Sequence, residues 1–254
     1  METDRQTHIS EEVIPGIPPP APGHYVSERE YWENYYERTS GDLLYEWNDG
    51  VLEEKPMADK ESFRMYKWFG NLLENYLKTN PLGETMGLEI GFRLPLGKKT
   101  SVRRPDLAVI LKSNRIQMDP FERSYRGIFD VCVEFLSDSA PKEVVRDTVT
   151  KKNEYCRAGV GEYFILDRKG RETAFYRLSG GAYTPILPTR DGVILSSVLP
   201  GFRFREGDLY ERPSEIEMAQ DPVYSDFVRL DWQKERLRAE KEKLRAGEAE
   251  MRAE

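Results

Sequence analysis

Two runs of this sequence decide its fold: Val102-Arg103-Arg104-Pro105-Asp106-Leu107-Ala108-Val109-Ile110 and Ile128-Phe129-Asp130-Val131-Cys132-Val133-Glu134-Phe135-Leu136. Both runs are rich in β-branched and large apolar residues, as buried strands are. Asp106 and Glu134 stand where an apolar residue would be expected. A buried carboxylate is costly unless it is paired, hydrogen-bonded or bound to a metal ion. The two runs therefore predict two strands that together carry a polar site.

Side-chain alternation indicates how the two carboxylates could meet. Alternate residues of a strand share a face, so Asp106 is expected beside Ala108 and Glu134 beside Cys132. If the two strands are neighbours, one register places both carboxylates together. A hard divalent cation such as Mg²⁺ would remove their mutual repulsion, because it prefers carboxylate oxygens. With a lysine close by, such a site suits phosphodiester hydrolysis.

The remaining pattern predicts an α/β domain with a central mixed sheet flanked by helices. Helices are expected from the capping signal at Ser27, over 61–78, and from Pro141 to about Arg157. Strands are expected at 43–47, 51–53, 85–96, 162–167, 173–178, 183–187 and 202–204, in addition to the two runs above. These assignments follow the apolar periodicity and the Gly, Pro, Asn and Asp turn signals.

The ends of the chain differ in composition from its middle. Residues 1–24 contain a crowd of prolines and predict an unstructured leader, residues 25–212 the folded domain, and residues 213–254 a charged helical tail. Leu230, Leu237, Leu244 and Met251 are seven residues apart, but Lys234, Lys241 and Glu248 occupy the alternate heptad positions. Only half of a coiled-coil seam is therefore apolar. We expect little core from this tail and a nearly unchanged melting temperature when 222–254 are deleted; a homodimer is left open.

Composition excludes some classes of protein. No run approaches the roughly 18–20 apolar residues of a membrane helix, and the first residues lack the apolar region of a signal peptide. The two cysteines, Cys132 and Cys156, form no CxxC pair and are expected as reduced thiols, which favours a cytoplasmic location. The formal net charge of −7 is a mild argument against a nucleic-acid-binding protein, although a metal ion can supply local positive charge.

Several short motifs occur in a fixed order. They are Tyr45-Glu46-Trp47-Asn48-Asp49-Gly50, Pro105-Asp106, Glu134-Phe135-Leu136-Ser137, Lys151-x-x-x-Tyr155 and Ala158-Gly159-Val160-x-Glu162-Tyr163-Phe164-Ile165-Leu166-Asp167. In this order the chain resembles the Uma2 family, formerly DUF820, over roughly residues 25–210. That family belongs to the PD-(D/E)XK nuclease superfamily, so the resemblance implies a restriction-endonuclease-like fold and metal-dependent cleavage of DNA.

The resemblance also implies roles for particular residues. Asp106 and Glu134 would be ligands of Mg²⁺ or Mn²⁺, Glu46 an accessory acidic ligand, and Lys151 the catalytic lysine. The superfamily lysine normally stands two residues after the second acid, where this chain has Leu136. Lys151 matches the family's lysine on the following helix. Many relatives carry a His before the long second helix, and the segment 59–63 of this chain has none.

Each assignment has a structural alternative. Asp106 could form a salt bridge with Arg103 or Arg104, Glu46 could cap its hairpin, and Lys151 could be a solvated helix residue. A helical wheel does not decide whether Lys151 or Lys152 reaches the site. The competing function is a catalytically weak or inactive nuclease-fold module that binds nucleic acid or protein. A structural coiled-coil adaptor would not explain Asp106 and Glu134.

Overall fold

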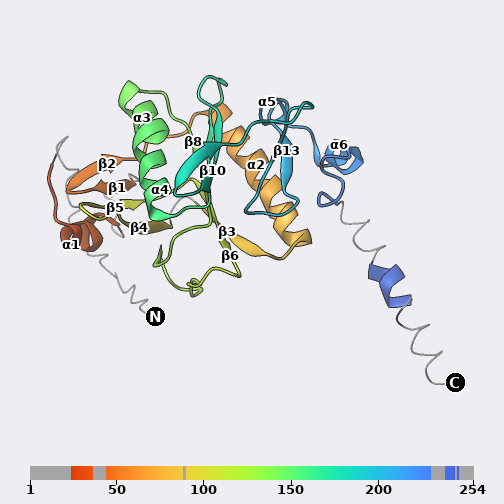
Figure 1. Ribbon diagram of the computed structural model, residues 1–254, viewed down its shortest axis with the longest axis horizontal. Coiled ribbons are helices and arrows are strands. Elements are labelled where there is room, and N and C mark those ends of the chain that lie inside the picture. The colour runs from red at the N-terminus through yellow and green to blue at the C-terminus, as the bar shows by residue number, and fades with distance from the viewer. Residues whose placement is uncertain (1–23, 37–43, 88–89, 230–237, 244, 246–254) are drawn as a thin grey trace, which may run out of the picture. The chain divides into compact units, whose positions relative to one another are not determined.

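The computed structural model describes residues 24–36, 44–87, 90–229, 238–243 and 245 (Figure 1). The chain divides into two compact units, residues 1–55 and residues 56–254. Of the predicted leader, only His24 falls within the described residues. The apolar heptad positions of the predicted tail lie outside them, whereas residues 238–243 are helical.

The first unit contains a short helical segment and a β-hairpin. The helix α1 (Glu28–Glu30) continues as the π-helix η1 (Tyr31–Tyr36), and the hairpin joins β1 (Tyr45–Asn48) to β2 (Val51–Glu54). Ser27 caps α1 as its sequence predicts, because its hydroxyl accepts a hydrogen bond from the backbone N–H of Glu30. Asp49 and Gly50 both have positive φ angles, as a two-residue hairpin turn requires.

The second unit is built on a six-stranded mixed sheet with the order β11-β10-β9-β8-β6-β3. Its strands are β3 (Gly83–Gly87), β6 (Leu107–Leu111), β8 (Val131–Phe135), β9 (Glu162–Leu166), β10 (Ala174–Ser179) and β11 (Ala182–Pro185). The strands β8 and β9 are parallel, and the other neighbours in this sheet are antiparallel. The parallel pair needs a crossover, which the helical run between β8 and β9 supplies.

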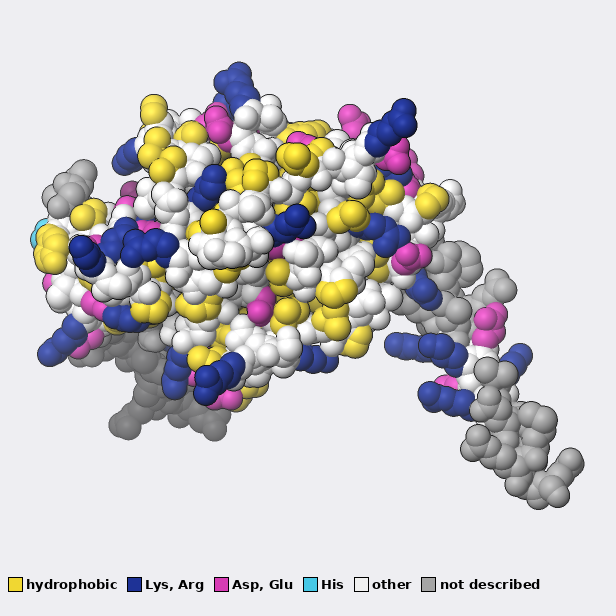
Figure 2. Space-filling model, viewed as in Figure 1, with side chains coloured by type: hydrophobic (Ala, Val, Ile, Leu, Met, Phe, Trp, Pro, Cys, Tyr) yellow, Lys and Arg dark blue, Asp and Glu magenta, His cyan; other side chains and the backbone are white. Residues whose placement is uncertain are grey.

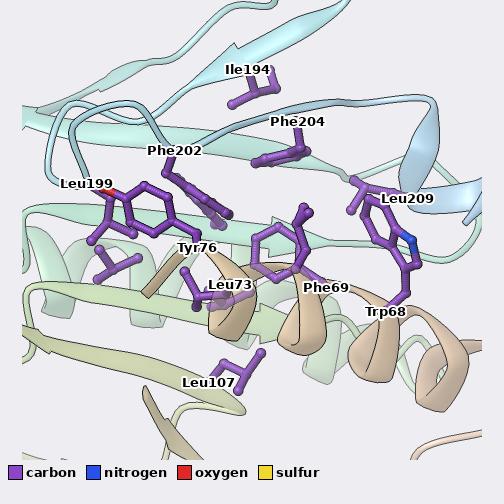
Figure 3. Packing of buried hydrophobic residues seen from close by; sticks show 14 of the residues in the cluster. Trp68, Phe69, Leu73, Tyr76, Leu107, Ile194, Leu199, Phe202, Phe204 and Leu209 are labelled. Atoms are coloured by element: carbon purple, nitrogen blue, oxygen red, sulfur yellow. The ribbon is translucent and has the colours of Figure 1, made fainter. Parts of the chain in front are cut away.

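One face of this sheet packs against the long helix α2 (Lys60–Thr79). Phe69 and Tyr76 lie on the apolar stripe of α2 and point toward Phe202 and Phe204 (Figure 3). The ring centroids of Phe69 and Phe204 are 5.2 Å apart with nearly perpendicular planes, which is a favourable edge-to-face arrangement. Phe164 of β9 joins this aromatic core, with its ring centroid 6.4 Å from that of Phe69, and thereby connects the sheet to α2.

The opposite face packs against a helical run made of α3 (Pro141–Val145), the π-helix η2 (Arg146–Lys151) and α4 (Lys152–Ala158) (Figure 1). The run begins at Pro141 and ends at Gly159, whose φ of 96° forms a left-handed C-cap. Strand alternation separates the two faces: Val133 belongs to the core on the α2 side, whereas Cys132 belongs to the core on the α4 side. Glu134 is therefore directed toward the α4 side.

Two of the expected single strands are each divided in two. The stretch 85–96 contains the end of β3 and all of β4 (Gly91–Pro95), and the stretch 102–110 contains the end of β5 (Thr100–Arg103) and most of β6. In each case the two strands lie in different sheets, since β4 pairs with β5 and with β7 (Ser124–Tyr125). Pro105 has no N–H to donate to a ladder, which accounts for the second break. Asp106 thus precedes β6 rather than lying within a strand.

The C-terminal part of the second unit extends the core beyond the expected boundary at residue 212. It contains β12 (Val193–Leu195), β13 (Arg203–Arg205), α5 (Asp208–Glu211) and α6 (Glu215–Gln220). Tyr224, Phe227 and Val228 are buried in the same core as α2. Phe227 packs edge-to-face on Tyr76, with ring centroids 5.6 Å apart. The buried core therefore reaches Val228, within the stretch that the sequence analysis assigns to the tail.

The expected fold class is confirmed: helices flank a mixed sheet. Within the residues described, we find no helix with both the length and the apolar character needed to cross a membrane.

Candidate active site

Asp106 lies just before β6, and Glu134 lies in the adjacent strand β8. Leu107 pairs with Val133 in this antiparallel ladder, so each acidic residue is the chain neighbour of one member of that pair. Oδ2 of Asp106 accepts a hydrogen bond of 2.7 Å from the backbone N–H of Phe135. This bond orients the Asp106 carboxylate at the end of β8, and the side chain remains partly exposed.

The Glu134 carboxylate is buried and meets two donors from the helical run. Nζ of Lys151 lies 3.0 Å from Oε1 of Glu134, and the Tyr155 hydroxyl donates a hydrogen bond of 2.8 Å to the same oxygen. The Lys151 side chain is only 1% exposed and that of Glu134 only 3%. A charge buried to this degree requires a partner of opposite sign, so the reading of Lys151 as a solvated lysine is wrong.

Lys152 points to a different part of the second unit. Its Nζ lies 4.0 Å from the centroid of the Tyr176 ring on β10, in a cation–π contact. Of the two adjacent lysines, Lys151 is therefore the one that reaches Glu134.

A second acid, Asp147, lies four residues before Lys151 in the π-helix η2. Oδ1 of Asp147 lies 3.5 Å from Nζ of Lys151 and 3.3 Å from Nε of Arg146. The Tyr163 hydroxyl on β9 donates a hydrogen bond of 2.9 Å to the Asp147 carbonyl. Burial and the nearby carboxylates of Glu134 and Asp147 raise the pKa of Tyr163 well above its ordinary value, so its hydroxyl remains a donor. Wide helical turns of this kind are frequent at functional sites.

A buried ionic network attaches α4 to β5. Oε2 of Glu154 accepts from Nε of Arg103 at 2.6 Å, and its Oε1 accepts from Nζ of Lys99 at 2.6 Å and from the Ser101 hydroxyl at 3.1 Å. Burial acts to raise the pKa of Glu154, but Arg103 and Lys99 outweigh it and leave that pKa lowered. Because Glu154 lies between Lys151 and Tyr155 in sequence, this network fixes the helix that carries both.

The segment after Glu134 is held by charged groups from the turn after β9, which also contact the N-cap of α2. Asp138 accepts hydrogen bonds from Arg168 and Lys169, which lower its pKa to about 2. Arg168 also forms an ion pair with Asp59, the N-cap residue of α2. These contacts tie the segment after β8 to the start of α2, at the end of the sheet where Asp106 and Glu134 lie.

The donor set at this end of the sheet fits a hard divalent cation. Asp106 and Glu134 supply carboxylate oxygens from adjacent positions, and Mg²⁺ is commonly bound by one or two carboxylates while it retains several waters. Across the described ranges, no group of three or more His, Cys, Asp and Glu side chains is arranged to hold a metal ion. The predicted accessory ligand Glu46 is buried in β1 of the first unit, so its participation stays a prediction.

Comparison with known proteins identifies the family. A family model described as "Uma2: Putative restriction endonuclease" matches residues 32–207, which is more than half of the chain. This chain belongs to the Uma2 family. The resemblance found in the sequence motifs is thereby confirmed.

A solved structure supports the fold assignment of this Uma2 protein. It is titled as the crystal structure of "a putative nuclease belonging to DUF820" from Anabaena variabilis ATCC 29413. The two chains are 14% identical, with a TM-score of 0.55 over 71% of this chain and 97% of the other. The restriction-endonuclease-like fold is therefore shown, whereas such a low identity carries no residue roles. The comparison with curated proteins found no match.

Motif reasoning for this Uma2 chain located part of the arrangement. The structure places Lys151 against Glu134 and joins Asp106 to the backbone of Phe135, the next residue. It adds Tyr155, which the Lys-x-x-x-Tyr motif contained without an assigned role. Glu162 of the last motif is elsewhere: its carboxylate accepts from Ser196 and Ser197 and holds that loop. Asp147 was missed, and its position four residues before Lys151 was the available signal.

Proposed function

We propose that this chain is a metal-dependent endonuclease that hydrolyses phosphodiester bonds of DNA. The observation that carries the proposal is that Asp106 accepts a hydrogen bond from the N–H of Phe135, the residue after Glu134, while Lys151 lies 3.0 Å from Glu134. Family membership supports the nuclease class. The DNA substrate and the choice of Mg²⁺ or Mn²⁺ are part of the proposal, as is the cytoplasmic location suggested by the two free thiols.

Each residue has a distinct part in this proposal. Asp106 and Glu134 would hold the cation, with Asp106 already oriented by the N–H of Phe135. A bound divalent cation would supply an activated water and would offset charge on the phosphate. Lys151 would place a compact positive charge beside that water or beside the scissile phosphate. Glu46 is proposed as an accessory acid from the first unit.

The distribution of surface charge gives no strong additional argument. In the view of Figure 2, Lys and Arg side chains are scattered, with acidic and apolar side chains between them. A continuous basic stripe is therefore not evident on this face, in keeping with the net charge of −7.

The second candidate is a nuclease-fold module that binds without cutting. The observation that favours it is the burial and pairing of Glu134. Its Oε1 is engaged by both Lys151 and Tyr155, and all three side chains are buried. A module in this state would bind DNA or a protein partner and would have no turnover.

A plasmid-nicking assay tests the proposal. The wild-type protein is incubated with supercoiled DNA in Mg²⁺, in Mn²⁺ and in a chelator, beside the variants D106N and E134Q. We expect nicking that needs the metal and is lost in both variants, with D130N as a control that retains it. Asp130 lies just before β8 and bonds to Leu111 and Asn114 instead. Metal-independent nicking, or equal nicking by all variants, would contradict the proposal; wild-type binding of DNA without cleavage would favour the second candidate.

A further inference from the structure

We infer that Asp147 is a positioning residue for Lys151, and that it remains the partner of that lysine when Glu134 is engaged by a cation. The claim that Asp147 positions Lys151 in the metal-free protein rests on the geometry of the helical run alone. The claim about the metal-bound protein also rests on the proposed function.

The first argument is the sharing of one ammonium by two buried carboxylates. Nζ of Lys151 lies 3.0 Å from Glu134 and 3.5 Å from Asp147, and the side chains of the three residues are between 1% and 4% exposed. Glu134 alone would suffice to neutralise one lysine. Asp147 is a second carboxylate at the same ammonium and has Arg146 as a further cationic partner, so Lys151 keeps an acidic neighbour that does not depend on Glu134.

The second argument is that Asp147 is itself held firmly. Its carboxylate contacts Arg146, and its carbonyl accepts from Tyr163, which comes from the neighbouring strand β9. Both contacts come from groups other than Lys151. Asp147 therefore has fixed points of attachment from which it can orient the lysine.

The third argument concerns charge in the metal-bound state. A cation held by Glu134 would repel Lys151 and weaken the attraction between the two side chains. Asp147 lies on the helical run rather than on the strand, and it would keep its full attraction for the ammonium. It would thus hold Lys151 beside the cation and limit its competition for Glu134. Losing a supporting contact of this kind typically costs about 10–100-fold in metal affinity or activity.

Calorimetric titration with Mn²⁺ tests how Asp147 acts. We expect D147N to weaken Mn²⁺ binding by about 10-fold or more, and to have no further effect in the K151Q background, because Asp147 acts through Lys151. D130N is the matched control and should leave the affinity unchanged, since its carboxylate bonds to Leu111 and Asn114. An equal effect of D147N in the wild-type and K151Q backgrounds would overturn the inference, because it would show a through-space charge effect only.

Nuclear magnetic resonance of the lysine ammonium groups separates this inference from the proposed function. Lys151 is the buried lysine among the described residues, so its ammonium protons should exchange slowly and give a signal that K151Q removes. We expect the signal in the metal-free wild type and D130N, and its loss in D147N. With Mn²⁺ replaced by diamagnetic Mg²⁺, the signal should persist in the wild type.

The outcomes are distinguishable. A wild type that binds no divalent cation refutes the metal site, while the metal-free spectra still decide on Asp147. An unchanged Lys151 signal in D147N overturns the inference whether or not metal binds. If D147N does not fold, Y163F replaces it, because this variant removes the contact to the Asp147 carbonyl and leaves every charge in place. A Lys151 signal that does not shift in Y163F then overturns the inference.

Discussion

The Tyr155 hydroxyl donates a hydrogen bond of 2.8 Å to Oε1 of Glu134, the same oxygen that lies 3.0 Å from Nζ of Lys151. Oε1 of Glu134 is thus engaged by two donors from the helical run. Tyr155 is fully buried against Phe92 and Tyr163. Its ring is therefore fixed by packing, and its hydroxyl sets the orientation of the Glu134 carboxylate.

Tyr155→Phe should fold and should lose metal affinity. The ring packing is retained, while one hydrogen bond to a charged acceptor is lost, which typically costs about 1.5–3 kcal/mol of stability. We expect a lower melting temperature and weaker Mn²⁺ binding by calorimetry. Tyr183→Phe is a suitable control, since its hydroxyl bonds to the Val160 carbonyl. Equal metal affinities for the wild type and Y155F would refute an orienting role for this hydroxyl.

The two strand-end acids should both be needed for metal binding. Asp106→Asn and Glu134→Gln each remove one charge from the pair while keeping side-chain size. Calorimetry with Mg²⁺ or Mn²⁺ should show binding in the wild type that falls at least 10-fold in each variant. Undiminished binding in both variants would mean that the cation is held elsewhere.

Asp138 should make stability depend on pH in the acid range. Hydrogen bonds from Lys169 and Arg168 lower its pKa to about 2 from the ordinary 3.8. A lowered folded-state pKa contributes stability above the unfolded-state value, and this contribution is lost as pH falls from about 4 to about 2. We expect D138N to be less stable than the wild type at pH 7 and equally stable near pH 2, measured by urea unfolding. A stability difference that does not change with pH would rule out the charge of Asp138 as its cause.

Deleting the buried residues near the C-terminal end should lower the melting temperature. Tyr224, Phe227 and Val228 are each at most 2% exposed, and burying one large apolar side chain contributes about 1.5–3 kcal/mol. Deletion of 222–254 should therefore lower the melting temperature strongly, contrary to the expectation from sequence. Deletion of 230–254 is the control and should lower it far less. Similar melting temperatures for the two truncations would show that these three residues add little to the core.

Sequence reasoning predicted the face on which Glu134 lies, and it failed where the local geometry is irregular or the contacts are distant in the chain. The alternation of β8 directs Glu134 away from Val133, and this follows from strand geometry alone. The choice between Lys151 and Lys152 could not be made, because the wheel assumed a regular α-helix and Arg146–Lys151 is π-helical. Asp147 was missed although it lies four residues before Lys151, a spacing at which helical side chains are neighbours. The burial of Tyr224 and Phe227 depends on contacts with α2 that no local periodicity reveals.

The adjacent lysines give the sharpest comparison of all. Lys151→Ala would leave Glu134 and Asp147 buried without their shared ammonium, so this variant should be less stable than the wild type. Breaking a buried ion pair by removing one partner typically costs about 3–5 kcal/mol. Lys152→Ala loses only a contact with Tyr176, worth about 0.5–1 kcal/mol at exposed sites. Urea unfolding should show this difference, and Mg²⁺ should restore more stability to K151A than to the wild type, because the cation replaces the missing charge.

In the plasmid-nicking assay K151A should lose about 10²–10³ in rate, as single-donor losses do, whereas K152A should retain most of its activity. An inactive K152A beside an active K151A would refute the assignment of Lys151.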